Sequence, residues 1–128
     1  MAFLHHIANT AVHSASGQTL PVIDPATGET FATIERGNAA DVDQAVSAAR
    51  HCFDTAWGRL TAAERGRLLM QLSRKVAEHA DELAALEQRD CGKPVKQARA
   101  DALALVRYFE FYAGAGDKLH GDTIPYLD

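Results

Sequence analysis

The sequence has 128 residues, of which 47% are hydrophobic and 23% charged, and its formal net charge is −4. This length and composition suit one ordinary folded domain with a modest core, and they exclude disorder as the default state. The Lys and Arg side chains are scattered rather than gathered on one face, which argues against nucleic acid as a partner.

The amino-terminal segment, residues 1–17, is predicted to be flexible. It opens with Met-Ala-Phe-Leu-His-His-Ile, which lacks a basic leader and has two histidines interrupting its apolar stretch. Neither feature is typical of a secretory signal or a membrane span. The two cysteines, Cys52 and Cys91, are too few for a disulfide framework and suit a reducing compartment. We therefore expect a cytoplasmic protein without a membrane partner.

A β-hairpin is predicted over residues 18–36, with one strand near 19–23 and a second near 29–34. The connecting residues are Asp24-Pro25-Ala26-Thr27-Gly28. Proline presets the first dihedral angle of a turn, and glycine tolerates a positive φ. This chemistry indicates a tight reversal between two short strands.

Four helices are predicted to follow the hairpin. Asn38 and Asp41 make an approximate capping box at the start of the first helix, and Thr61 and Glu64 make a second box at the start of the next. Trp57 and Gly58 interrupt the apolar spacing between these two helices.

The third predicted helix covers about residues 81–89, and the fourth covers 95–113. Gly92 can supply a left-handed cap after the third helix, and Pro94 cannot continue it. The fourth helix is expected to break up at Gly114 and Gly116, and residues 121–128 show no regular pattern. Two strands make only a marginal sheet, so the apolar stripes of these helices predict cover from outside the 128 residues.

The reactive side chains do not form a recognisable catalytic set. Cys91 follows a helix carboxyl end beside Asp90, where negative influences oppose a thiolate, so we expect a partly buried structural thiol. Cys52 is expected in the core, and the histidines have no metal-ligand spacing. The carboxylate of Asp90 is unfavourable at a helix carboxyl end unless a cation or a donor compensates it, which hints at a site.

Several spaced motifs occur in one order along the chain and together resemble the start of the aldehyde dehydrogenase superfamily. They are Asp24-Pro25-Ala26-Thr27-Gly28-Glu29, Asp41-Val42-Asp43-Gln44-Ala45-Val46, Ala63-Glu64-Arg65, Leu86-Glu87-Gln88-Arg89-Asp90-Cys91-Gly92-Lys93-Pro94, Tyr112-Ala113-Gly114 and His120-Gly121-Asp122-Thr123-Ile124-Pro125. The resemblance covers about residues 19–125, and the agreement of several motifs is more specific than any one of them.

This resemblance implies an α/β enzyme that oxidises aldehydes to carboxylic acids with NAD or NADP through a cysteine thioester. Family chains are several times longer and form homodimers or homotetramers. The oxyanion asparagine, the cofactor loop, the base glutamate and the nucleophilic cysteine of the family match no position in this sequence. The chain alone is therefore expected to be inactive.

The resemblance also divides the chain and suggests two sets of site residues. Residues 18–120 would be the amino-terminal part of the NAD(P)-binding domain, and 121–128 the start of a connection toward the oligomerisation arm. Val22, Ile23 and Asp90 map onto ligands of a structural K⁺ or Na⁺ ion, and oxygen-only ligation suits such a hard cation. Ala100, Asp101 and Ala104 map onto the substrate entrance, although an ordinary surface helix is an equal alternative.

One alternative from a different functional class stays open. The chain could be a stand-alone helical interaction module derived from such an enzyme, with its exposed apolar stripes serving as a partner surface. Cooperative unfolding of a monodisperse chain would favour the module, whereas aggregation or loose packing would favour a segment of the longer enzyme.

Overall fold

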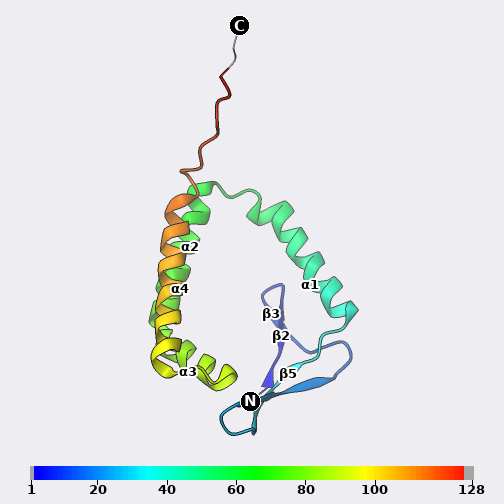
Figure 1. Ribbon diagram of the computed structural model, residues 1–128. Coiled ribbons are helices and arrows are strands. Elements are labelled where there is room, and N and C mark those ends of the chain that lie inside the picture. The colour runs from blue at the N-terminus through cyan, green and yellow to red at the C-terminus, as the bar shows by residue number, and fades with distance from the viewer. Residues whose placement is uncertain (1, 126–128) are drawn as a thin grey trace.

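The computed structural model of the chain describes residues 2–125. Its elements are, in chain order, β1 (Ala2–Phe3), β2 (His5–Ile7), β3 (Thr10–Val12), β4 (Thr19–Ile23), β5 (Thr30–Glu35), α1 (Ala39–Cys52), the π-helical turn η1 (Phe53–Trp57), α2 (Ala62–Glu78), α3 (Ala80–Cys91) and α4 (Val95–Ala115). Helices α2 and α4 run side by side, and α3 and the strands lie at one end of this pair (Figure 1).

The larger sheet has three strands in the order β1-β5-β4. Strands β4 and β5 form the predicted hairpin, with Val22 opposite Ala32, and the ladder is irregular between Val22 and Ile23. The turn closes as its residues suggest, because Gly28 has φ +75 and its N–H donates to the Asp24 carbonyl oxygen at 2.7 Å. Pro21 is tolerated because β4 is an edge strand, where a missing backbone donor costs little.

The amino-terminal segment is more regular than the sequence suggests. Where residues 1–17 were expected to be flexible, β1 pairs in parallel with β5, and β2 pairs antiparallel with β3. The turn between β2 and β3 uses positive φ at both Ala8 (51°) and Asn9 (61°), a pattern that matches the twist of a two-residue hairpin.

Both predicted capping boxes are present. The Asn38 side chain accepts from the backbone N–H of Ala40 and Asp41, and the Asp41 carboxylate accepts from the Asn38 N–H at 2.9 Å. At the start of α2, Thr61 and Glu64 exchange the same reciprocal bonds. Helix α1 ends in η1 and lies apart from the α2–α4 pair (Figure 1).

Small residues allow α2 and α4 to approach closely. A Cβ placed on Gly66 of α2 would collide with the carbonyl oxygen of Ala113 in α4. Ser73 of α2 is buried and donates from its hydroxyl to the Val106 carbonyl at 3.0 Å. Ala98 of α4 is completely buried, so small side chains make up the best-packed part of the described chain.

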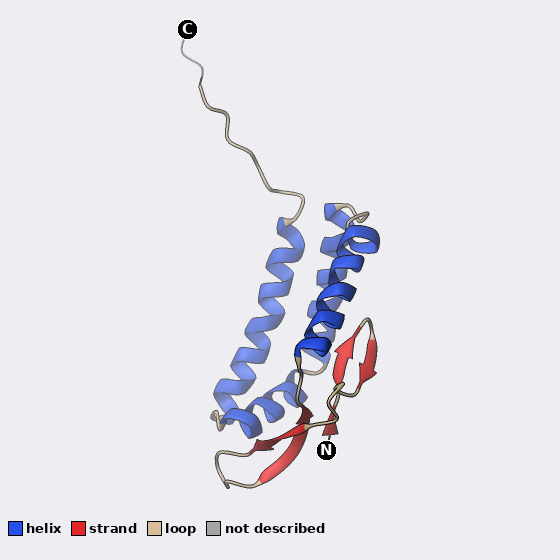
Figure 2. Cartoon of the chain, turned by 90° about the vertical axis from the view of Figure 1, so that its right-hand side faces the viewer, coloured by secondary structure: helices blue, strands red, loops and turns tan. Residues whose placement is uncertain are grey.

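Helix α3 ends at Gly92, which is left-handed with φ 70°, as predicted from the Gly-Lys-Pro sequence. Helix α4 extends to Ala115 and therefore includes Gly114, where the sequence predicted that the helix would break up. Residues 121–125 have neither helix nor strand, as expected, while the rest of the 121–128 tail lies outside the described residues (Figure 2).

Candidate functional site

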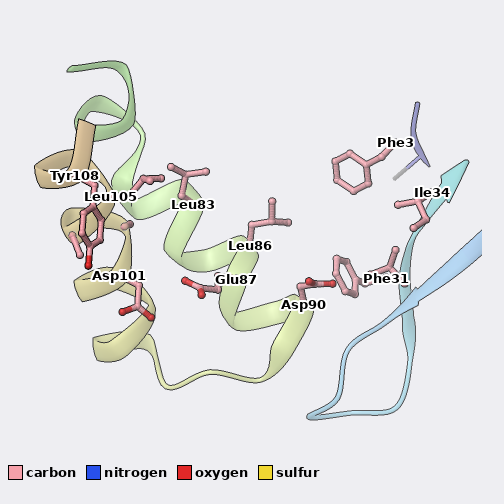
Figure 3. A pocket seen from close by; sticks show the side chains of 13 residues that line it. Phe3, Phe31, Ile34, Leu83, Leu86, Glu87, Asp90, Asp101, Leu105 and Tyr108 are labelled. Atoms are coloured by element: carbon pink, nitrogen blue, oxygen red, sulfur yellow. The ribbon is translucent and has the colours of Figure 1, made fainter. Parts of the chain in front are cut away.

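A hollow of about 890 Å³ opens between the three-stranded sheet and helices α3 and α4. The sheet contributes Phe3, Phe31 and Ile34, and the helices contribute leucines on the opposite side (Figure 3). The complete lining is Phe3, Val22, Phe31, Ile34, Leu83, Leu86, Glu87, Asp90, Asp101, Ala102, Ala104, Leu105 and Tyr108. The hollow is therefore largely apolar, with three carboxylates among its lining residues.

Four of the six residues singled out from the sequence line this one hollow. They come from both suggested sets: Val22 and Asp90 from the cation set, and Asp101 and Ala104 from the entrance set. Ile23 and Ala100 are exposed and are absent from the lining. The fold thus brings together residues that are far apart in the sequence.

The turn of the β4–β5 hairpin is seated against the end of α3. Pro25 lies so close to Gly92 that a Cβ there would approach the proline Cγ at 3.0 Å. Arg89 of α3 places its guanidinium over the Phe31 ring, 4.5 Å from the centroid, and lies 3.9 Å from the Asp24 carboxylate. Val22 of β4 and Asp90 of α3 both line the hollow.

A lysine that the sequence analysis did not select connects α3 with α4. The Lys93 ammonium donates to Asp101 Oδ2 at 2.7 Å and also contacts Glu87. The hydrogen bonds from Lys93, and then from Gln97, hold the pKa of Asp101 below its ordinary value. The same bonds to Asp101 and Glu87 raise the pKa of Lys93. The sequence does contain a signal for this ion triad. A lysine lies in the link between two helices, and each helix carries an acidic residue nearby.

A second group of buried carboxylates fixes the amino-terminal segment to the start of α1. Asp41 accepts from the Ala15 N–H at 2.8 Å and from the Ser14 hydroxyl at 2.9 Å. Glu35 accepts from the Ser14 N–H at 2.8 Å and contacts His13 Nδ1 at 2.9 Å. Hydrogen bonds from the backbone N–H groups of Ala15 and Ser14 are the main reason that the pKa values of Asp41 and Glu35, respectively, are lowered.

The cysteines do not take the buried positions expected from the sequence. Both Cys52 and Cys91 are exposed, because their helix faces are not covered by other described residues. The Cys91 thiol donates to the Glu87 carbonyl oxygen at 3.0 Å, within its own helix. Neither thiol lines the hollow, so neither is placed as a nucleophile for a molecule bound there.

The described residues offer neither a side-chain metal cluster nor a helix that could span a membrane. Within residues 2–125 no three His, Cys, Asp or Glu side chains are grouped closely enough to hold a metal ion. The suggested cation set differs from such a cluster, because it requires backbone carbonyl oxygens beside a single carboxylate. Among the helices in this range, none combines the length and apolar character needed to cross a bilayer.

Comparison with known sequences identifies long relatives. The model of the aldehyde dehydrogenase family matches residues 11–128. The Arabidopsis thaliana protein named aldehyde dehydrogenase family 2 member B4, mitochondrial, is 47% identical over 116 residues, which are 89% of this chain and 22% of that protein. Retinal dehydrogenase 2 of Homo sapiens is 43% identical over 122 residues, which are 93% of this chain and 24% of that protein. This chain spans about a quarter of the length of these relatives.

Comparison with solved structures gives the same result. A candidate aldehyde dehydrogenase from Burkholderia cenocepacia has a TM-score of 0.92 and 59% identity, and the match covers 97% of this chain and 26% of that chain. PnpE in complex with nicotinamide adenine dinucleotide has a TM-score of 0.91 and 38% identity, over 99% of this chain and 26% of that chain. The predicted α/β fold of the family is thereby confirmed. This chain belongs to the aldehyde dehydrogenase family and corresponds to the amino-terminal part of its longer members.

Proposed function

We propose that this chain serves as the amino-terminal scaffold of an NAD(P)-dependent aldehyde dehydrogenase whose catalytic residues lie in other parts of the enzyme. Family membership supports this proposal, together with the exposure of both cysteines away from the hollow. In the complete enzyme a cysteine would attack the aldehyde, and NAD or NADP would accept the hydride. No residue of this chain is assigned to either step.

The apolar hollow is the observation that carries the scaffold role. Leu86 and Tyr108 line it, and they are 45% and 63% exposed. Val42 and Val46 of α1 are also exposed, at 57% and 60%. Apolar surface on this scale is stabilised when further protein covers it, at roughly 25 cal/mol for each Å² removed from water. The remainder of the enzyme is the proposed cover.

Two sets of residues, four of which line the hollow, extend this proposal. Val22, Ile23 and Asp90 are proposed to hold K⁺ or Na⁺ through backbone and carboxylate oxygens, and the irregular ladder at Val22 and Ile23 is consistent with backbone groups available outside the sheet. Asp101 and Ala104, with Ala100 nearby on α4, are proposed to border the entrance for the aldehyde.

The wider assembly is also part of the proposal. Residues 18–120 would belong to the NAD(P)-binding domain, and 121–128 would begin the connection toward an oligomerisation arm in a homodimer or homotetramer. A cytoplasmic location stays a prediction, and two relatives carry mitochondrial in their names.

The test is an aldehyde oxidation assay on the purified chain, followed by intact mass measurement. The 128-residue chain of 13.8 kDa should not reduce NAD⁺ or NADP⁺ with acetaldehyde or benzaldehyde. Activity should appear when it is co-expressed with a second polypeptide that supplies the remainder of the Burkholderia cenocepacia relative. Turnover by the isolated chain at that mass would contradict the proposal.

The same samples decide between the scaffold and the interaction module. A scaffold segment with an open apolar hollow should bind a hydrophobic dye and unfold with low cooperativity until the second polypeptide is present. A monodisperse chain that unfolds cooperatively and does not bind the second polypeptide would instead support the interaction module.

A further inference from the structure

The described chain consists of two parts joined by a short link. The strands, α1 and η1 make up the strand part, residues 2–57, and helices α2, α3 and α4 lie in the helix part, residues 61–125. Residues 58–60 connect the two parts without regular helix or strand. Figure 1 shows α1 leading to this link at one end of the α2–α4 pair, while the strands approach α3 at the opposite end. The two parts therefore meet at two separate places.

Each part is held together by its own hydrogen bonds. In the strand part, the Asp41 carboxylate of α1 accepts from the Ser14 hydroxyl at 2.9 Å, so α1 is tied to the amino-terminal segment. In the helix part, the Ser73 hydroxyl of α2 donates to the Val106 carbonyl of α4 at 3.0 Å. Among the described residues, no hydrogen bond joins the strand part directly to the helix part. Each part can thus move as one body.

The first meeting place is the link itself. Arg65 of α2 donates twice to the Leu60 carbonyl oxygen, at 3.2 and 2.8 Å, and its guanidinium lies 5.8 Å from the centroid of the Trp57 ring. The Leu60 N–H in turn donates to the Trp57 carbonyl oxygen at 3.2 Å. A short link held in this way leaves the two parts one main motion, which is a rotation about residues 58–60.

The second meeting place is a set of contacts that we call the hairpin latch, made of Asp24, Pro25, Phe31, Arg89 and Gly92. Arg89 lies 4.5 Å from the centroid of the Phe31 ring and 3.9 Å from the Asp24 carboxylate. Pro25 is seated so close to Gly92 that a Cβ there would approach it at 3.0 Å. The Arg89 side chain is 58% exposed, so water competes with the charged contacts of this latch.

The hollow lies between the two parts. Phe3, Phe31 and Ile34 line it from the strand part, whereas Leu83 and Leu86 line it from α3 in the helix part. Figure 3 shows these two groups of side chains on opposite sides of the hollow. Since Phe31 belongs both to the latch and to the lining, separation of the latch would move apart the two walls of the hollow.

We propose that residues 58–60 are a hinge closed by the hairpin latch. The isolated chain then exchanges between a closed form, in which the hollow exists, and an open form, in which its two walls are apart. Arg89 favours the closed form most, because it contacts both Phe31 and Asp24 from α3. Together, an exposed arginine–ring contact and an exposed ion pair change such an equilibrium by roughly tenfold.

A distance measurement by electron paramagnetic resonance tests the hinge in the chain itself. Both native cysteines, which are exposed, are first replaced by serine. Spin labels are then attached at Asp43→Cys of α1 and Lys96→Cys of α4, two exposed positions in different parts. The unchanged latch should give one main distance and a minor, longer one. Arg89→Ala should raise the ratio of the longer to the main distance about tenfold.

Arg50→Ala is the matched control for this substitution. Arg50 lies 5.8 Å from the centroid of the Phe53 ring, but both residues belong to the strand part, so the two distances should keep their ratio. If Arg89→Ala loses helix content by circular dichroism, Phe31→Leu replaces it, since it removes the ring from the other side of the latch. A ratio unchanged by the latch variant, or changed equally by Arg50→Ala, would overturn the proposal.

The consequence of this hinge for assembly rests on the proposed function. Only the closed form presents both walls of the hollow together, so the polypeptide that supplies the remainder of the Burkholderia cenocepacia relative should bind that form. Its addition to labelled Arg89→Ala should convert the longer distance into the main one. A complex that keeps the longer distance would overturn the hinge proposal. Absence of binding to the unchanged chain would instead refute the proposed function, while the distances in the isolated chain would still decide on the latch.

Discussion

The α2–α4 pair and the hollow beside it are built from the same helix α4, yet they differ in how they are completed. Between α2 and α4 the contact surface is made of small buried residues such as Ser73 and Ala98, and a hydroxyl donates directly to the facing backbone. Around the hollow the side chains are large and half exposed, as Leu86 and Tyr108 illustrate. One face of α4 is thus satisfied within this chain, and another is suited to contact with further protein.

The contrast between the two faces of α4 indicates which contacts this segment can form on its own and which need the rest of an enzyme. Backbones that approach through glycine, alanine and serine need no outside partner, because the packed surfaces already exclude water. Large apolar side chains at an open rim gain most of their burial only when a second layer arrives. Substitutions on the two faces should therefore have unequal effects in the isolated chain.

The largest effect should follow a substitution at the closest approach of α2 and α4. Gly66→Ala places a Cβ against the backbone carbonyl of Ala113, and backbone atoms cannot move aside as a flexible side chain can. We expect a loss of about 2–3 kcal/mol in the free energy of unfolding. Hydrogen exchange at the Val106 amide, which reports the opening of the α2–α4 pair itself, measures it.

Gly114→Ala is the matched control for that substitution. Gly114 is also helical, but a Cβ there meets nothing within 4 Å, so the better helix propensity of alanine should leave stability unchanged or raised by about 0.5 kcal/mol. Equal losses for the two variants would show that the close contact with Ala113 is not responsible.

The next largest loss of stability should follow a substitution where the hairpin turn contacts the end of α3. Gly92→Ala must adopt φ 70° and also place its Cβ 3.0 Å from Pro25, so we expect a loss of about 2 kcal/mol. Gly28→Ala has a similar φ of 75° and open space around it, and should cost about 1 kcal/mol. The difference in unfolding free energy measures the contact with Pro25, and it should vanish if the turn is not seated there.

Acidic pH should loosen the amino-terminal segment before it affects the α2–α4 pair. The pKa values of Asp41 and Glu35 are lowered by backbone hydrogen bonds, so their contribution is fully present above the ordinary carboxyl values of about 4. It is lost as the pH falls through the lowered values. Hydrogen exchange as a function of pH should show Ala15 opening first, and simultaneous opening of α2 would contradict this order.

In the isolated chain, the smallest loss of stability is expected for a substitution in the lining of the hollow. Leu86 is 45% exposed, so Leu86→Ala should cost only about 0.5–1 kcal/mol in the isolated chain. The same substitution should cost about 2–5 kcal/mol once the remainder of the enzyme buries this side chain. Equal losses in the two states, measured by hydrogen exchange at the amides of α3, would mean that nothing further covers the hollow.

Local signals in the sequence predicted much of this fold. Asn38 with Asp41 and Thr61 with Glu64 specify helix starts, because each pair satisfies backbone groups within one turn. Gly92 with Pro94 specifies a helix end for an equally local reason. These elements required no knowledge of what they pack against.

The features that the sequence analysis missed depend on contacts between distant residues. The parallel pairing of Phe3 with Ile34 leaves no local pattern in two residues of strand. The Lys93 bridge depends on the angle between α3 and α4, and exposure of Cys91 depends on which helix faces are covered. The α2–α4 pair, the hollow and its carboxylate rim could therefore be understood only from the fold.

The most direct test is hydrogen exchange of the chain with and without the polypeptide that supplies the rest of the Burkholderia cenocepacia relative. The account predicts that Ser73 and Val106 are protected in both samples, whereas Leu83 and Leu86 become more protected only when the second polypeptide is bound. Equal protection of Leu86 in the isolated chain and in the assembly would contradict the claim that this segment is a scaffold completed by the rest of an aldehyde dehydrogenase.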